Sequence, residues 1–188
     1  MRELFGLRLL TLAGKLPVTA AIRWLRSHHI DFQPQQYRYE AGGGTRVSAR
    51  ELGVDEHSVI KTLVMETDLG DPLVILMHGD QKVSTKNLAR TLGVRKVVPC
   101  KPAVADRHSG YTVGGTSPFG LKRQMPIYVE ASILELERIA INGGGRGFLV
   151  QLNPMILVDP LGAQTVEVAV AASFATLRSR VRPLPKPL

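Results

Sequence analysis

The most informative single side chain in this sequence is Lys61, which lies in the apolar run SVIKTLVME. It is the only lysine or arginine between Glu51 and Gln81, a window that also holds seven carboxylates. If the run is a strand, alternation places Lys61 on the face of Leu63 and Met65, where a lysine is rarely fully buried without a partner. Two interpretations follow: Lys61 binds an anion in a cleft, or it lies at the strand end and extends its ammonium to water.

The second candidate is the glycine-rich segment HSGYTVGGTSPFG at residues 108–120. Its GTSPFG part is followed by Leu121, so the phosphate-loop pattern G-x-x-x-x-G-K-[ST] is not completed, and NGGGRG does not fit G-x-G-x-x-G. Gly114 and Gly115 would allow a ligand to approach backbone N–H groups. Two such donors aimed at one point form an oxyanion hole, worth about 3 kcal/mol per donor. The alternative is a tight connection between two strands.

Other residue types that carry chemistry are arranged less favourably. The five histidines form no H-E-x-x-H motif, and we expect neither a metal site nor a cofactor. Cys100 has no sign of a paired histidine, so we expect an inert or partly buried thiol. Ser117 lacks the G-x-S-x-G elbow. The sequence therefore has no recognisable protein nucleophile.

The elements that must position these residues follow from hydrophobic periodicity. Helical patterns occur at Thr19 to about His28, VSARELG, STKNLARTLG, PAVADRH, the start of ILELERIAIN and NPMILVDPLG. Strand patterns occur in DFQPQQYRY, SVIKTLVME, PLVILMHG, RKVVP, MPIYVEAS, the end of ILELERIAIN, RGFLVQL and AQTVEVAV. Pro34 restricts the first strand to a sheet edge, and GGG at 143–145 is expected to turn the chain. The mixture predicts a single mixed α/β (α+β) domain.

Length and composition agree with one globular domain. The chain has 188 residues, of which 44% are hydrophobic and 21% charged. We place the domain at residues 18–174, after an N-terminal extension at 1–17 and before a basic, proline-containing tail at 175–188 that we expect to be disordered. A single cysteine favours a reducing compartment such as the cytoplasm. No apolar run approaches the roughly 18 residues that cross a bilayer, so we expect no membrane partner.

Positive charge is concentrated in a few parts of the chain. The net charge is +8, but the two ends supply most of it and residues 18–174 keep only +2. Within that core, the stretch from Lys82 to Arg107 holds seven cations against one carboxylate, Asp106. Such a stretch could contact phosphates, or it could form a solvated helix face.

The order and spacing of six segments resemble those of the YbaK/EbsC family of Cys-tRNA(Pro) deacylases, which is similar to the editing domain inserted in bacterial prolyl-tRNA synthetases. The segments are VTAAIRWLRSHHIDFQ, QYRYE, VIKTLVM, STKNLARTLG, HSGYTVGGTSPFG and NGGGRGF, and together they span about Val18 to Val170. The resemblance implies a compact domain with a curved, barrel-like mixed β-sheet and flanking helices. It also implies a trans-editing enzyme that hydrolyses mischarged aminoacyl-tRNA without a metal. Editing is needed because a methylene-sized difference gives a synthetase only about 1 to 3 kcal/mol of discrimination.

The resemblance assigns roles to single residues. Lys61 matches the functional lysine of the K-T-L motif, which would hold the terminal adenosine of the tRNA or its phosphate. Tyr37 matches a pocket tyrosine that would position the aminoacyl group. Gly114 and Gly115 match a loop whose backbone faces the ester carbonyl.

Further matches surround that loop. The predicted substrate-binding set continues with Thr116, Ser117, Pro118 and Phe119 of the loop and its far wall, and with Asn142 and Gly143, which together with Gly144 make a second small-residue turn. Two positions depart from the family pattern: Glu130 stands where related sequences often have Asp, and Asn142 where some have Ser.

The missing nucleophile favours a substrate-assisted reaction, in which a cysteinyl thiol attacks its own carbonyl while the protein supplies positioning and oxyanion stabilisation. The G-Y-x-V-G-G form of the loop is closer to the cysteine-clearing branch than to the alanine-clearing one. The alternatives are an Ala-tRNA(Pro) deacylase that uses water, a non-catalytic module that binds tRNA or prolyl-tRNA synthetase, and a hydrolase of free small esters. The expected partners are mischarged tRNA, tRNA(Pro) foremost, and prolyl-tRNA synthetase in a transient complex.

Overall fold

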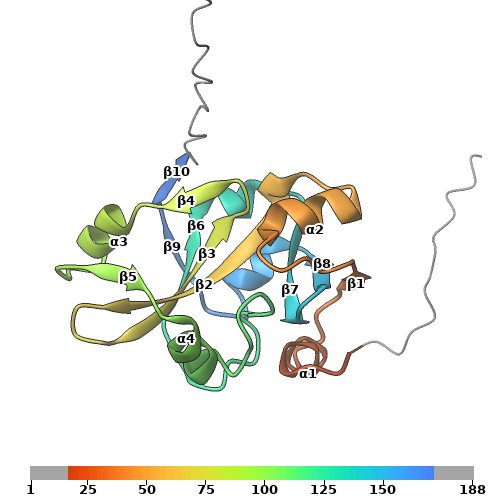
Figure 1. The fold of residues 1–188 in the computed structure, drawn as a ribbon, viewed down its shortest axis with the longest axis horizontal. Helices are drawn as coiled ribbons and strands as arrows, with labels where there is room; N and C mark the ends of the chain where they lie inside the picture. Colours follow the sequence, from red (N-terminus) through yellow and green to blue (C-terminus); the bar gives the residue numbers. More distant parts are fainter. Residues whose placement is uncertain (1–16, 172–188) are drawn as a thin grey trace, which may run out of the picture.

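The computed structural model describes residues 17–171, which form one mixed α/β domain built on an eight-stranded sheet (Figure 1). The predicted fold class is confirmed. The predicted extension, except for Pro17, and the predicted tail lie outside the described residues.

Local sequence signals set several of the helix ends, through a capping side chain or through a glycine that adopts the left-handed conformation. The helices are α1 Ala20–Ser27, α2 Gly44–Leu52, α3 Thr85–Thr91 and α4 Pro102–Ser109, with single 3-10 turns η1 Glu56–Ser58, η2 Ala131–Glu135 and η3 Pro154–Leu157. Thr19 caps α1 by accepting a hydrogen bond from the Ile22 amide at 3.1 Å. Gly53 ends α2 in the left-handed conformation, at φ 65°.

The described part of the chain contains ten strands in two sheets. They are β1 Gln33–Gln36, β2 Val59–Thr67, β3 Pro72–His78, β4 Gln81–Val83, β5 Val97–Pro99, β6 Ile127–Glu130, β7 Ile139–Gly145, β8 Phe148–Leu152, β9 Gln164–Val166 and β10 Ala169–Ala171. The main sheet has the order β1-β8-β7-β2-β3-β6-β9, with β5 also paired to β2, and β4 pairs with β10 in a second, two-stranded sheet. β1, which contains Pro34, is an end strand as expected.

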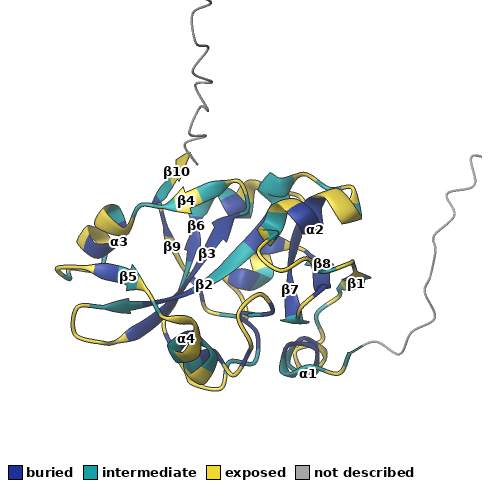
Figure 2. Cartoon of the chain, viewed as in Figure 1, coloured by how far each residue is buried: buried dark blue, intermediate teal, exposed yellow. Residues whose placement is uncertain are grey.

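The apolar core covers both faces of the main sheet, and β3 at its centre is buried throughout (Figure 2). Leu76 packs in the cluster that includes Ile22 and Leu25 of α1. Its neighbour Met77 packs in the opposite cluster, which includes Leu88 of α3. Burial on both faces explains why the PLVILMH run has no polar alternation.

β2 has one fully paired edge and one divided edge. Along the first, it pairs with β3 from Ile60 opposite His78 to Glu66 opposite Pro72. Along the second, β7 pairs only at residues 59–60 and β5 only at residues 65–67. Residues 61–63 therefore face a gap between β7 and β5.

One local prediction is wrong at the glycines of NGGGRG. Gly143–Gly145 continue β7 instead of turning the chain, with a bulge between Asn142 and Gly145, and the turn comes at residues 146–147. The Asn142 side-chain oxygen accepts the amides of Gly144 at 2.7 Å and Gly145 at 3.0 Å. This side chain holds the bulge, which turn propensity does not reveal.

Two C-terminal predictions also need correction. The NPMILVDPLG segment forms only the 3-10 turn η3. AQTVEVAV is two strands, β9 and β10, in different sheets, because the Glu130 carboxylate accepts the amides of Val168 and Ala169, both at 2.8 Å, and holds the link between them. Glu130, one of the two departures from the family pattern, is buried in this structural role.

Candidate functional site

A pocket of about 540 Å³ lies where the edge of β2 is divided. Its floor comes from β2 residues 59–65. Its walls come from α2 with the segment before it, the start of α4 with the end of β5, the loop at 113–116 and the β7–β8 turn, with Tyr37 and Tyr39 at the side. This volume falls in the range of small-ligand sites, and an apolar wall with a few polar groups is typical of them.

The structure brings half of the predicted site residues together. Lys61, Tyr37, Gly114, Thr116 and Asn142 line the pocket. The other half, which is not part of the pocket lining, consists of Gly115, Ser117, Pro118, Phe119 and Gly143.

Lys61 is half-buried, and its ammonium donates hydrogen bonds to the carbonyl oxygens of Gly79, at 3.0 Å, and Gln81. Burial lowers the pKa of Lys61 from its ordinary value, and the carboxylates of Glu56 and Asp80 oppose that shift. Lys61 makes no ion pair with any residue in the range 17–171. An ammonium has three donors, so one remains for a ligand. The second interpretation, in which Lys61 lies at the strand end and extends its ammonium to water, is therefore wrong.

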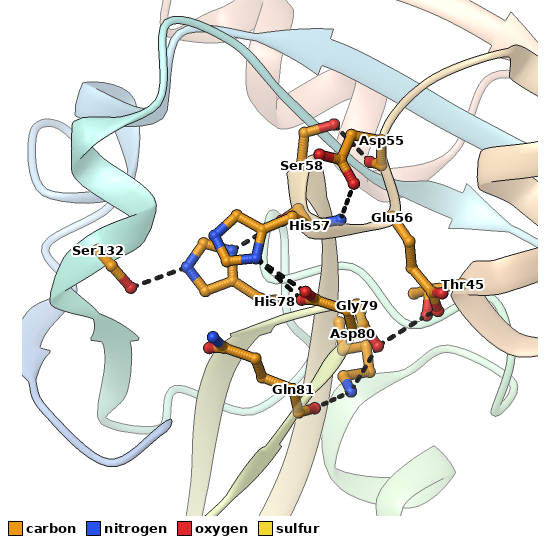
Figure 3. A network of polar contacts seen from close by, with 11 residues as sticks. Thr45, Asp55, Glu56, His57, Ser58, His78, Gly79, Asp80, Gln81 and Ser132 are labelled. Atoms are coloured by element: carbon orange, nitrogen blue, oxygen red, sulfur yellow. Dashed lines mark hydrogen bonds and ion pairs between the residues drawn. The ribbon is translucent and has the colours of Figure 1, made fainter. Parts of the chain in front are cut away.

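The turn that receives Lys61 is braced on both sides (Figure 3). On one side, Thr45 Oγ1 lies 3.1 Å from the Gly79 carbonyl oxygen and 2.8 Å from Glu56 Oε1. On the other side, the Asp80 carboxylate contacts His57 Nδ1 at 3.0 Å, and the His57 ring stacks on His78 with centroids 3.7 Å apart. These contacts fix the carbonyl groups that hold Lys61.

His78 is fully buried beneath this turn. Its Nδ1 lies 2.7 Å from the His57 carbonyl oxygen, which can only accept, so Nδ1 carries the proton. Its Nε2 lies 2.9 Å from Ser132 Oγ and accepts from that hydroxyl. Burial lowers the pKa of His78 and keeps the ring neutral, and the ring does not line the pocket. His78 therefore supports the turn.

The glycine loop presents different amides from those expected. The Gly115 N–H donates to the Thr112 carbonyl oxygen at 2.8 Å, so it is not available to a ligand. A Cβ on Gly115 would lie 2.9 Å from the Arg146 backbone nitrogen, which shows how closely the loop approaches the β7–β8 turn. The Gly114 and Thr116 amides donate no hydrogen bond to any of the residues that the structure describes. Within the loop at 113–116, the two pocket-lining amides left without an acceptor among the described residues are therefore those of Gly114 and Thr116.

Arg146 and Tyr39 were not identified from the sequence, although both lie in segments that carry the family resemblance. Arg146 Nε and Nη2 donate to the Val113 carbonyl oxygen at 3.1 and 2.9 Å, and the guanidinium lies 5.5 Å from the centroid of the Tyr39 ring. Asn142 Nδ2 lies 3.4 Å from the Gly114 carbonyl oxygen. These contacts attach the loop to the β7–β8 turn.

Thr62 lies at the open part of the β2 edge. The Val64 carbonyl accepts from the Cys100 amide, whereas the Thr67 amide donates on the β3 side, to Asp71. Because the direction of backbone groups alternates along a strand, the N–H and C=O of Thr62 point into the gap. Thr62 Oγ1 is also buried without a hydrogen-bond partner among residues 17–171. Within residues 17–171, the divided edge of β2 therefore leaves the backbone N–H and C=O of Thr62 without a strand partner at the pocket floor.

The residues expected to form the far wall of the loop anchor it instead. Ser117, Pro118 and Phe119 are buried, and the Phe119 ring stacks against Trp24 with centroids 5.2 Å apart. The Gly143 carbonyl accepts from Thr19 Oγ1. In this structure these residues connect the loop and β7 to the core.

Cys100 lines the pocket, but its thiol is not activated. Burial, with the nearby Glu66 carboxylate, raises the pKa of Cys100 to about 11. Its Sγ lies 3.7 Å from Glu66 Oε2. The thiol is therefore protonated at neutral pH, in agreement with the expectation of a partly buried, inert cysteine.

The family model of the aminoacyl-tRNA editing domain matches residues 42–159. The chain belongs to this family. All residues that line the pocket, except Tyr37 and Tyr39, fall within the matched range. The resemblance to the YbaK/EbsC editing proteins is thereby confirmed.

Similar proteins include one from Enterococcus faecalis named "Putative Cys-tRNA(Pro)/Cys-tRNA(Cys) deacylase EbsC", which is 27% identical over 151 residues, covering 80% of this chain and 92% of that protein. A proline--tRNA ligase of Geobacter metallireducens is 28% identical over 95 residues, which are 50% of this chain and 16% of the ligase. The chain thus resembles a small part of that much longer enzyme.

Solved structures share the fold. "Crystal structure of a putative trans-editing enzyme for prolyl tRNA synthetase" describes a chain with a TM-score of 0.71 at 20% identity, covering 84% of this chain and 100% of that one. The hypothetical protein APE2540 gives a TM-score of 0.74 at 21% identity, covering 80% and 99%.

None of the helices within residues 17–171 has the length and apolar character to cross a membrane. No group of three or more His, Cys, Asp and Glu side chains in that range is placed to hold a metal ion.

Proposed function

We propose that this protein is a trans-editing deacylase that hydrolyses the ester of mischarged aminoacyl-tRNA, with Cys-tRNA(Pro) as its main substrate. The observation that carries the proposal is the pocket in an editing domain that combines the partly desolvated ammonium of Lys61 with the unused amides of Gly114 and Thr116. The names of the relatives support the choice of substrate.

Four polar groups of the pocket have tasks in this reaction. The remaining donor of Lys61 binds the terminal adenosine of the tRNA or its phosphate. The Gly114 and Thr116 amides bind the ester carbonyl oxygen as negative charge develops on it, where each well-aligned donor contributes about 3 kcal/mol. The open carbonyl of Thr62 accepts a hydrogen bond from the substrate's α-ammonium group.

The substrate supplies its own nucleophile. The cysteinyl sulfur forms a bond to the carbonyl carbon, the ester C–O bond breaks, and the thiol proton passes to the ribose oxygen that leaves. Water then opens the thiolactone to give free cysteine. Holding the thiol and the carbonyl in contact provides the rate enhancement of an intramolecular reaction. Cys100 takes no part, because its raised pKa leaves it protonated.

A panel of mischarged tRNAs tests the proposal. Purified protein is incubated with Cys-tRNA(Pro), Ser-tRNA(Pro), Ala-tRNA(Pro) and Pro-tRNA(Pro), with and without prolyl-tRNA synthetase, and release of the amino acid is measured. Serine matches cysteine in shape but has a hydroxyl in place of the thiol, so the substrate-assisted route predicts much faster release of cysteine than of serine. Equal release of alanine and cysteine would instead assign the protein to the alanine-clearing branch.

The Lys61→Ala variant separates an enzyme from a binding module. The proposal predicts that wild-type protein releases cysteine well above the spontaneous rate and that the variant does not. If both proteins remain at the spontaneous rate with every tRNA in the panel, the protein is a non-catalytic module.

A further inference from the structure

A second depression, of about 450 Å³, lies between α3 and β5. Four of its lining side chains are cationic, namely Lys86, Arg90, Arg95 and Lys96, and none is acidic. All four belong to the basic stretch at 82–107. We call this depression the α3–β5 groove.

The charges of the α3–β5 groove are not neutralised by the rest of the described chain. All four cationic residues are exposed, and none makes an ion pair within residues 17–171. The carboxylate of Asp68 accepts hydrogen bonds from the backbone amides of Arg95 and Lys96, at 3.2 and 3.4 Å. By contrast, Arg50 on α2 contacts both Glu40 and Glu51. A solvated helix face usually mixes both signs, whereas this groove carries one.

The α3–β5 groove and the pocket adjoin at one shared lining residue. Pro99, the last residue of β5, lines both depressions. From there the chain enters α4, whose first residue, Pro102, also lines the pocket. Figure 1 shows α3 beside β5 and α4 beyond the end of that strand. A polymer with one end in the pocket can therefore follow the groove away from it.

We propose that the α3–β5 groove binds the ribose-phosphate backbone of the RNA strand whose aminoacylated end enters the pocket. The inference rests on the proposed function, because it takes RNA as the substrate. Several unpaired cations along one groove match a chain of regularly spaced phosphates, whose binding releases counterions.

The lining also distinguishes RNA backbone from other ligands. Protein interfaces depend on aromatic anchors at their centre, and no aromatic residue lines the α3–β5 groove. The same feature means that the groove has no aromatic side chain on which a base could stack. The groove therefore adds affinity and register without reading sequence.

The salt dependence of RNA binding tests this inference. The double variant Arg90→Gln/Arg95→Gln removes two groove charges, and Arg26→Gln/Arg138→Gln removes two exposed arginine charges elsewhere. Binding of uncharged tRNA(Pro) is measured between about 50 and 200 mM KCl. Each phosphate contact contributes about 0.7 to 0.9 to the slope of log K against log salt. The groove variant should reduce that slope by about 1.5 and weaken binding about tenfold at the low-salt end, and the control pair should change neither.

A second groove variant, Lys86→Gln/Lys96→Gln, should act in the same direction, and the melting temperature of each variant verifies folding. The inference is overturned if the groove variants keep the wild-type slope, or if the control pair loses as much. It is also overturned if they lose binding to prolyl-tRNA synthetase while RNA binding is unchanged, since the groove would then be a protein contact.

The two proposals fail in different ways. If wild-type protein deacylates no tRNA but the groove variants still reduce the slope, the proposed function fails and the RNA-binding groove stands. If wild-type protein deacylates Cys-tRNA(Pro) but the groove variants bind tRNA with the same salt slope as wild type, only the groove proposal fails. With both correct, the groove variants raise KM and leave kcat unchanged.

Discussion

Lys61 Nζ lies 3.0 Å from the carbonyl oxygen of Gly79, and a second bond to the Gln81 carbonyl holds the ammonium against the turn between β3 and β4. A carboxylate partner would neutralise the charge of the ammonium. The two carbonyl oxygens stabilise the cation and leave its net charge in place. The half-buried charge therefore remains available to an anionic or strongly polar ligand in the pocket.

Replacing Lys61 by glutamine should remove activity and leave the fold intact. The Lys61→Gln variant removes the charge, and kcat/KM for deacylation should fall about 100-fold or more, the loss typical when a transition-state donor is removed. Lys82→Gln is the matched control, because Lys82 is exposed on the neighbouring strand β4 and lines neither depression. Comparable losses in both variants would contradict a specific role for Lys61.

The titration of Lys61 should respond in opposite directions to two neighbouring charges. Burial lowers the pKa of Lys61 below its ordinary 10.5, the Glu56 carboxylate raises it, and the Lys82 cation lowers it. The Lys61 side chain is mainly protonated below its pKa. Binding of tRNA that depends on the ammonium should therefore be lost as the pH rises through the lowered pKa of Lys61. Glu56→Gln should move the transition to lower pH and Lys82→Gln to higher pH, as followed by NMR of the Lys61 side chain. Shifts of the same sign would refute this description of the site.

Substitution of Gly114 should separate loop geometry from general backbone strain. Gly114 has φ 90°, and a Cβ there would lie 2.9 Å from the Tyr39 hydroxyl, whereas Gly70 has φ 81° and open space around its Cβ position. Alanine at either position carries a similar left-handed penalty of about 1 kcal/mol. Both variants should melt a few degrees lower than wild type, but only Gly114→Ala should reduce deacylation, by about tenfold or more. Equal activities would show that the Gly114 backbone does not face the substrate.

Cys100 should react slowly with alkylating reagents. A thiol pKa of about 11 lies about two units above the ordinary value of 9.0, so the reactive thiolate is about 100-fold rarer at neutral pH. Because the chain has a single cysteine, mass spectrometry of iodoacetamide-treated protein reports on Cys100 alone. The rate should rise steeply between pH 8 and about 11, with free cysteine as the reference. Rapid labelling at pH 7 would indicate an activated thiol.

Acidification should destabilise the domain through His78. Burial lowers the pKa of His78 below its ordinary 6.5, so below that pH the unfolded chain binds a proton that the folded chain does not. Stability is therefore present above pH 6.5 and is lost as pH falls through this value. The melting temperature of wild type should drop by a few degrees more between pH 7 and pH 5 than that of His78→Gln, which cannot titrate. Parallel curves would place the acid sensitivity elsewhere.

Features that depend on neighbours in the chain could be predicted from the sequence. Thr19 caps α1 through an amide three residues away, and Gly53 ends α2 because it can adopt φ 65°. The two apolar runs on either side of the LGDP turn pair as β2 and β3. Lys61 could be recognised from the sequence because it is the one cation in the apolar run that forms β2. The order of the motifs around it indicated the family.

Tertiary structure decided which polar groups are free. Gly143–Gly145 remain in β7 because the Asn142 side chain accepts the amides of Gly144 and Gly145, and because Gly115 of the loop packs closely against Gly145. Packing likewise buries Ser117, Pro118 and Phe119 away from the pocket. Sequence spacing contains no information about such contacts.

The sequence by itself therefore determined the fold class, the family and the one cation of β2, Lys61, which lines the pocket, because periodicity, caps and motifs act over a few residues. The tertiary structure decided that Gly114 and Thr116, and not Gly115, keep their amides free, and that Arg146 holds Val113, a residue 33 positions away. It also decided that the basic stretch meets the pocket at Pro99. These relationships join segments that are distant in the chain, and only the packing of the sheet and its loops brings them together.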